Sequence, residues 1–506
     1  MFAAFGAQLE IVGTGLRNCP LPAADVLHGP ELETASTGLR SRGGLRGRGG
    51  YPGEARDLEA FRAAGWRFVE DPAVDWSEVQ EPYERLPLDA GLLARRPGGG
   101  LIVLRNRVIV KLKEGVDAGE RLGRYAGYEL LGFGRALYVV DLGVVGQDLQ
   151  GSIKNQLEEL QHSAEVEFAE PSVLFRVHRP LPTGPARWRS YPGALPRSMA
   201  VRESLHDQWH WGKICLADAW KLGGDQGKNC RVGVVDFGFH PDDPQLVPNV
   251  AWTGCVTAEG QCLENVPMPR DWHGTFCAGL IGAIQDDRRV YGAAPQCSLA
   301  LVALPEHHLL APEVLGEALK FCAERGGADV INCSIGTSES SMMLSNTLRE
   351  AIDDVHRSGR AGGRGCLIVW ASFNADTKFC EGAVEDYAPL LCVAASDSAD
   401  RRANSGWGSG LDLLAPGIRV PGLFCSVNGS SVSAESGASF AAPCVTGVAA
   451  LVLAARPELS ACELADLICQ SCDRVGPGEH PNPSVGWGRL NAEAALRRAL
   501  AIPQAQ

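Results

Sequence analysis

Three residues of the chain, Asp236, His273 and Ser439, carry the side-chain types that move protons and attack carbonyl carbons. Asp236 closes the apolar segment VGVVD, so we expect its carboxylate at the carboxyl edge of a buried sheet, where α/β proteins place their sites. Taken singly, the three also suit ordinary roles as a turn-capping aspartate, a satisfied core histidine and an N-cap serine. The residues around each of the three must therefore show whether its role is catalytic or structural.

The segments around His273 and Ser439 are typical of tightly packed, buried helices. HGTFCAGLIGA places His273 in a first turn and keeps one helix face small, so another element can approach closely. SGASFAAPCVTGVAALVLAA places Ser439 at the start of the most apolar helix of the chain. Free N–H groups and the helix dipole at that end favour a developing oxyanion, and Pro443 is tolerated because first-turn amides have no intrahelical partner.

Together the three segments resemble the signatures of the subtilisin-like (subtilase) family of serine proteases, in the order in which that family carries them. The signatures DTG, HGTxxAG and GTSxAAPxxxG stand here as DFG at 236–238, HGTFCAG at 273–279 and GASFAAPCVTG at 437–447. Three matches in one order are far more specific than any one of them. The likeness extends from Gln208 to Leu500.

The resemblance implies a serine endopeptidase that hydrolyses peptide bonds through an acyl-enzyme, with Asp236, His273 and Ser439 as its catalytic triad. Asn374, in ASFNAD, would supply the oxyanion hole. The residues of ADVINCSIG that would accept an extended peptide as an added strand are Ser334, Ile335 and Gly336. The implied partners are a protein or peptide substrate and the chain's own propeptide.

Four positions near these motifs depart from the family pattern: Phe237, Phe276, Phe373 and Ala438. We expect the three added phenyl groups to crowd one site and make its pocket drier. Phe373 stands where the family usually has a glycine before its oxyanion-hole asparagine, so the resemblance fixes the placement of Asn374 less firmly.

Calcium is a separate question, because the family's calcium-binding aspartate corresponds here to Gln245, in DDPQL. Asp242 and Asp243 stand close enough in sequence to substitute for it. We predict no required cofactor and no assigned metal ligand, with calcium left as an open alternative.

From Arg231 onward, short apolar strands alternate with helical segments. The strands RVGVV, SLALVA, ADVINCS, CLIVWAS and LLCVAAS are continuously apolar, which predicts burial on both faces in a doubly wound, mostly parallel sheet flanked by helices, as in the subtilisin-like fold. The expected helices include 312–324, 342–358 and 440–454.

A smaller α+β unit is predicted ahead of this fold. Residues 101–177 follow the order βαββαβ, which indicates a ferredoxin-like domain, and this unit is similar to the family's inhibitory propeptide. Residues 178–204 form a Pro- and Arg-rich linker in which we expect a processing site, and 205–500 form the catalytic domain. Residues 1–100 are irregular and partly flexible, with order expected to begin near Leu101.

Composition excludes several classes of function. A formal net charge of -13 argues against general nucleic-acid binding. No uninterrupted apolar run approaches the roughly 18 residues of a membrane span, and the N-terminus is a poor secretory signal. We therefore expect an intracellular protein as written, monomeric, with secretion allowed by the family resemblance.

The 17 cysteines are an odd number in a chain too large to depend on disulfides. Five lie among small or aliphatic residues and are predicted to be buried thiols: Cys277, Cys333, Cys366, Cys392 and Cys444. Local bridges between Cys255 and Cys262, and between Cys469 and Cys472, stay open.

Three alternatives compete with the protease. The first is a catalytically silent binding or regulatory protein on a subtilase scaffold. The second gives the main role to the Arg- and Gly-rich segment 40–50 as an RNA contact, which the acidic charge disfavours. The third is esterase or transferase chemistry at the same three residues.

Overall fold

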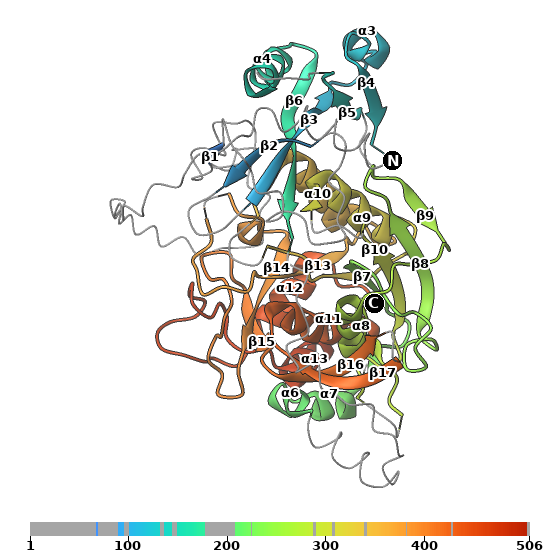
Figure 1. The fold of residues 1–506 in the computed structure, drawn as a ribbon. Helices are drawn as coiled ribbons and strands as arrows, with labels where there is room; N and C mark the ends of the chain where they lie inside the picture. The colour runs from blue at the N-terminus through green and yellow to red at the C-terminus, as the bar shows by residue number, and fades with distance from the viewer. Residues whose placement is uncertain are drawn as a thin grey trace.

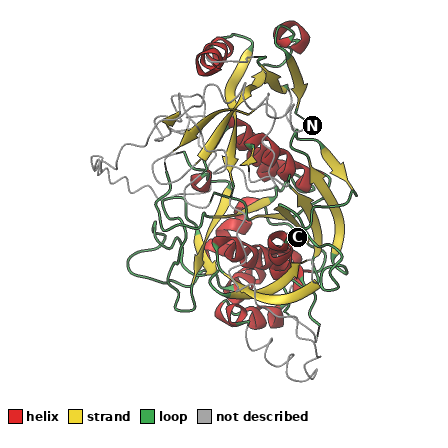
Figure 2. Cartoon of the chain, in the orientation of Figure 1, coloured by secondary structure: helices red, strands yellow, loops and turns green. Residues whose placement is uncertain are grey.

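The computed structural model describes residues 67–68, 90–95, 101–131, 136–143, 149–177, 208–223, 225–286, 290–305, 309–337, 342–380, 382–426 and 429–502. Within these ranges the chain forms a large unit around a mostly parallel sheet and a small unit around an antiparallel sheet (Figures 1 and 2). The predicted linker 178–204 and the segment 40–50 lie outside the described residues.

The large sheet has eight strands. Their bounds are β7 Arg231–Asp236, β8 Val250–Val256, β9 Cys262–Glu264, β10 Ser298–Ala303, β12 Val330–Cys333, β13 Leu367–Ala371, β14 Leu390–Ser396 and β15 Leu413–Pro416. The spatial order is β15-β14-β13-β12-β7-β10-β8-β9, and every pairing is parallel except that of β9 with β8. The central strands are buried along nearly their whole length, as their continuous apolar sequences predict.

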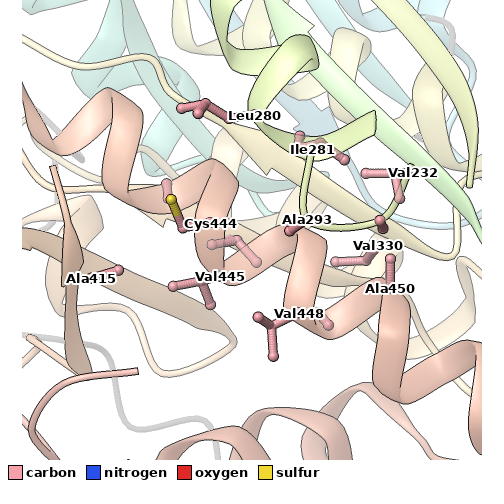
Figure 3. Packing of buried hydrophobic residues seen from close by; sticks show 14 of the residues in the cluster. Val232, Leu280, Ile281, Ala293, Val330, Ala415, Cys444, Val445, Val448 and Ala450 are labelled. Carbon is pink, nitrogen blue, oxygen red and sulfur yellow. The ribbon is translucent and has the colours of Figure 1, made fainter. Parts of the chain in front are cut away.

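Helices cover both faces of this sheet. Their bounds are α6 Trp209–Lys213, α7 Leu216–Leu222, α8 Trp272–Gly282, α9 Pro312–Glu324, α10 Asn346–Ser358, α11 Ala438–Ala455, α12 Ala461–Gln470 and α13 Ala492–Ala501. Residues of α8 and α11 share one hydrophobic cluster with Val232 of β7, and Figure 3 shows Val445 and Val448 of α11 in that cluster. Residues of α9 and α10 belong to the cluster on the opposite face. The predicted doubly wound fold is therefore confirmed.

Two predicted helix bounds change. The helix expected from residue 342 begins at Asn346, because the Ser345 hydroxyl accepts the backbone N–H of Leu348 and caps it there. The apolar helix begins at Ala438 and so includes Ser439 in its first turn. Although α11 has 18 residues and is apolar enough to cross a membrane, 89% of it is buried inside the protein, where it serves as a core helix.

The small unit contains β3 Leu101–Leu112, α3 Ala118–Leu122, β4 Gly127–Leu130, β5 Leu137–Asp141, α4 Leu149–Gln161 and β6 Val166–Arg176. These follow the predicted order βαββαβ, and the strands pair as β6-β3-β5-β4, all antiparallel. Two further strands, β1 Arg67–Phe68 and β2 Ala90–Arg95, extend the sheet beyond β3. Ordered structure thus starts before Leu101, because β2 finds a partner in the long strand β3.

The two units are joined by a short strand and by buried polar contacts. β11, Leu309–Leu310, belongs to the large unit but pairs antiparallel with β6. The Glu170 carboxylate accepts the backbone N–H groups of Asn346 and Thr347 at 2.7 and 2.9 Å and so caps α10 from the small unit. In Figure 1, α9 and α10 lie between the small sheet and the large one.

The cysteines behave mainly as apolar residues. All five predicted buried thiols are buried, which confirms that expectation. Cys255, Cys262 and Cys472 are unbridged, so neither of the two local disulfides is present. Burial raises the pKa of the Cys444 thiol and that of Cys366, which keeps both protonated.

Candidate active site

Asp236 and His273 meet at the carboxyl end of β7. The imidazole Nδ1 lies 2.9 and 3.0 Å from the two carboxylate oxygens of Asp236, and both residues are buried. The same carboxylate accepts the backbone N–H of Phe237 at 2.8 Å. An ionised carboxylate only accepts hydrogen bonds, so Nδ1 carries the proton and Nε2 is the basic nitrogen of the ring.

The first turn of α8 holds His273 in place from two sides. Asp271 caps the helix, and its carboxylate accepts the His273 backbone N–H at 2.7 Å. Gly274 packs against the end of β7, where an added Cβ would lie 2.2 Å from the carbonyl oxygen of Gly238 and 2.9 Å from the Asp236 Cβ. The small residue after His273 therefore permits the approach that brings the imidazole to the carboxylate.

Ser439 reaches the same place from α11. Its hydroxyl donates to the backbone carbonyl of Ser334 at 3.4 Å, and its own carbonyl accepts from the Ser334 hydroxyl at 2.9 Å. The Cys277 thiol of α8 also donates to the Ser439 carbonyl, at 3.4 Å. The Cys277 sulfur lies within 4.8 Å of ligand atoms of both Asp236 and His273. All three residues singled out in the sequence thus converge on one buried cluster.

Asn374 lies beside the N-terminus of α11. Its side-chain oxygen accepts the backbone N–H of Ala438 at 2.8 Å, and an added Cβ on Gly437 would lie 3.1 Å from that oxygen. This hydrogen bond leaves the Nδ2 end of the carboxamide as the donor. Despite the phenyl group that precedes it, Asn374 therefore lies next to the first turn of the helix that carries Ser439.

The predicted peptide-binding residues follow the end of β12. Ser334 and Ile335 are buried, and the Ser334 side chain is used to hold the first turn of α11. Gly336 is half-buried, and no atom of the described residues lies within 4 Å of a Cβ added there. Among the described residues, the space beside Gly336 is thus open.

The three added phenyl groups do not crowd one pocket, so that expectation is wrong. Phe237, Phe276 and Phe373 are all buried, but each belongs to a different hydrophobic cluster. Phe237 belongs to the cluster that includes residues of α9 and α10, Phe276 to the cluster that includes residues of α11, and Phe373 to a smaller third cluster. Phe276 is the one near His273, through Phe440, whose ring centroid lies 4.7 Å from Phe276 and 5.5 Å from the imidazole.

A buried hydrogen-bond chain behind Ser439 was not recognised in the sequence. The Thr446 hydroxyl donates to Asn332 at 3.1 Å, the Asn332 amide donates to the Ser334 hydroxyl at 2.9 Å, and that hydroxyl donates to the Ser439 carbonyl. The available signal was Asn332 in an otherwise apolar strand, since a buried amide needs partners. Cys277 was likewise assigned as a core thiol, without its contact to the cluster.

Comparisons with known proteins identify the family of the chain. The model of the subtilase family, Peptidase_S8, matches residues 227–488, which is just over half of the chain. Subtilisin BL from Lederbergia lenta is 32% identical over 277 residues, which cover 54% of this chain and 92% of that protein. A calcium-dependent protease from Nostoc sp. is 29% identical over 363 residues, and there the matched part is 60% of this chain but 53% of the relative. This chain therefore spans about half the length of that relative.

A solved structure extends the likeness beyond the part that the family model matches. Fervidolysin from Fervidobacterium pennivorans, described as a keratinolytic enzyme related to subtilisin, superposes with a TM-score of 0.59 at 20% identity. The superposition covers 78% of this chain and 61% of that one. At 20% identity, this match is evidence for a shared fold.

Proposed function

Because this chain belongs to the subtilase family of serine proteases, we propose that it is a serine endopeptidase in which Asp236, His273 and Ser439 act as the catalytic triad. The observation that carries the proposal is that Nδ1 of His273 lies within hydrogen-bonding distance of both carboxylate oxygens of Asp236, and that these contacts are buried. This pairing orients the imidazole and stabilises its charged form, which is what a general base needs when it takes a proton from serine.

In the proposed reaction, the Ser439 hydroxyl attacks the scissile carbonyl carbon while Nε2 of His273 removes its proton. His273 then returns the proton to the leaving amine, and water hydrolyses the acyl-enzyme by the same steps in reverse. The Ser439 backbone N–H at the start of α11 and the Asn374 Nδ2 would hold the oxyanion. Loss of one such donor costs about 3 kcal/mol of transition-state stabilisation.

The substrate is proposed to be a protein or peptide in extended conformation. Support comes from the open space at Gly336, since a backbone that adds as a strand needs room and unpaired peptide groups. Ester hydrolysis or acyl transfer at the same residues is the alternative chemistry, which peptide substrates can test directly.

The small unit is proposed to be an inhibitory propeptide that the enzyme itself removes. Its support is the way β6 docks on the large unit, through the strand pairing with β11 and the Glu170 cap on α10. The proposed cleavage falls in 178–204, directly after the end of this docked strand.

Calcium dependence is the property named in the Nostoc relative. In this chain the position of the expected calcium-binding aspartate is Gln245, whose side-chain nitrogen donates to Val290 O at 2.7 Å. A donor that faces the oxygens does not fit a cation among them, so no step of the proposed reaction involves calcium.

The test compares the wild-type chain with Ser439→Ala, and with Ser409→Ala as a surface control. We expect wild type and the control to lose the mass of the N-terminal part, with a new N-terminus within 178–204, while Ser439→Ala stays intact. A fluorophosphonate should label the first two and not the third. If all three chains stay intact and a peptide library yields no products, the catalytically silent scaffold is the correct interpretation.

A further inference from the structure

The side chain of Gln245 faces a group of three oxygen atoms in the large unit. Its Nε2 lies 2.7 Å from the Val290 carbonyl oxygen, 3.3 Å from Asp286 Oδ1 and 3.5 Å from the Ile284 carbonyl oxygen. The Gln245 backbone carbonyl accepts the Ile284 N–H at 2.9 Å, which fixes the two segments side by side. Gln245 is 2% exposed, so water does not compete for these contacts.

The three acceptors are of the kind that hard cations select. Two are backbone carbonyls and one is a carboxylate, and calcium in proteins takes 6–8 such oxygens at 2.3–2.6 Å. Placed together without a positive partner, oxygen atoms repel one another. In this chain the positive partner is the NH₂ end of the Gln245 carboxamide, which offers two N–H donors.

The neighbouring acids do not restore a cation site. Asp242 is directed to the surface, where it pairs with Arg270 at 2.6 Å. Asp243 is buried, but its two oxygens accept from the Gln245 backbone N–H and from the side chains of Ser430 and Cys425. Neither carboxylate is among the groups that contact Nε2 of Gln245.

The orientation of the carboxamide distinguishes the two interpretations. A cation among these oxygens would need the Oε1 of Gln245 to face them, and the observed 2.7 Å contact is instead an ordinary N–H···O length. Oε1 is buried, and no described residue donates a hydrogen bond to it. The Gln245 side chain thus donates hydrogen bonds to the oxygen cluster, while its own acceptor, Oε1, receives none from the described residues.

We propose that the Gln245 carboxamide takes the place of a calcium ion, so that the segments of Gln245 and Val290 are held together by N–H donors without metal. This inference concerns stability and is independent of the proposed peptidase activity.

The experiment measures thermal unfolding of the full chain in excess EGTA and in excess CaCl₂. All variants carry Ser439→Ala, so that self-cleavage does not interfere. Gln245→Glu keeps the size of the side chain but replaces the donor by a carboxylate, and Gln245→Leu removes both the donor and the acceptor. Calcium bound elsewhere shifts all three proteins equally and cancels in the comparison.

We expect the calcium-dependent rise in Tm to be the same for the parent chain and Gln245→Leu, and larger by about 5 °C for Gln245→Glu. If Gln245→Glu does not fold in EGTA, the yield of folded protein with and without CaCl₂ gives the same comparison. The proposal is overturned if calcium stabilises the parent chain more than Gln245→Leu. It is also overturned if Gln245→Glu gains nothing from calcium relative to the parent.

Discussion

A methyl group added to Gly274 would lie 2.2 Å from the carbonyl oxygen of Gly238, well inside van der Waals contact. The first turn of α8 therefore rests directly on the backbone that follows β7. Because His273 precedes Gly274 and Asp236 precedes Gly238 by two residues, this contact sets the distance between imidazole and carboxylate.

We predict that Gly274→Ala lowers kcat/KM on a peptide substrate by about 100-fold or more, because a shift of about 1 Å at the imidazole is enough for such a loss. Gly212→Ala, in α6, is the matched control, since no atom of the described residues lies within 4 Å of a Cβ added there. Activity of Gly274→Ala within twofold of the control would show that the helix can move without disturbing the site.

Glu170 should make docking of the small unit depend on pH. Burial raises the pKa of this carboxyl from 4.5 to about 7, against the lowering effect of its hydrogen bonds to Thr347 and Asn346. Between those values the folded chain holds a proton that the unfolded chain releases, so stability falls as pH rises from 4.5 to 7. The difference amounts to about 3 kcal/mol at most.

Unfolding of the Ser439→Ala chain by urea across this range checks the prediction. Glu170→Gln, which mimics the protonated carboxyl, should lose this part of the pH dependence and be at least as stable as its parent at pH 8. Equal pH slopes for the two proteins would contradict it.

His210 should change the folding stability with pH in the opposite direction to Glu170. It is fully buried in α6, neither ring nitrogen has a hydrogen-bond partner among the described residues, and burial lowers its pKa from 6.5 to about 3. The unfolded chain takes up a proton as pH falls below 6.5 and the folded chain does not, so stability is lost on acidification. His210→Phe should therefore be more acid-stable, by about 2 kcal/mol at pH 5. Urea unfolding at pH 5 and pH 8 measures this, and an unchanged acid sensitivity would refute it.

Cys277 should make the enzyme sensitive to soft metal ions. Its sulfur, a carboxylate oxygen of Asp236 and a ring nitrogen of His273 lie within 4.8 Å of one another. Burial raises the pKa of the thiol well above its usual value, so a metal must displace its proton and inhibition should strengthen as pH rises. We expect Hg²⁺ to abolish peptide cleavage, and Cys277→Val to be resistant.

Cys462→Ser is the control for this experiment, because Cys462 is the exposed cysteine among the described residues. Resistance of Cys462→Ser, with Cys277→Val still inhibited, would place the sensitive thiol on the surface.

Local sequence was sufficient for the central strands of the large sheet and for the presence of its buried helices, although not for every helix bound. Asp236, His273 and Ser439 could be selected because each lies in a short motif that resembles a signature of the subtilase family, and the three motifs stand in that family's order. The continuous apolar strands likewise predicted a sheet covered on both faces. A strand that is buried on both faces needs apolar residues at successive positions, and this pattern is visible in the sequence.

The tertiary structure decided what depends on contacts between distant segments. It placed Phe237, Phe276 and Phe373 in separate clusters, joined Thr446 and Asn332 to Ser334, and turned the amide nitrogen of Gln245 toward Val290. A residue's type shows which bonds it can form, but the direction of its side chain is set by elements that lie tens to hundreds of residues away in sequence. Those partners become known when the chain is folded.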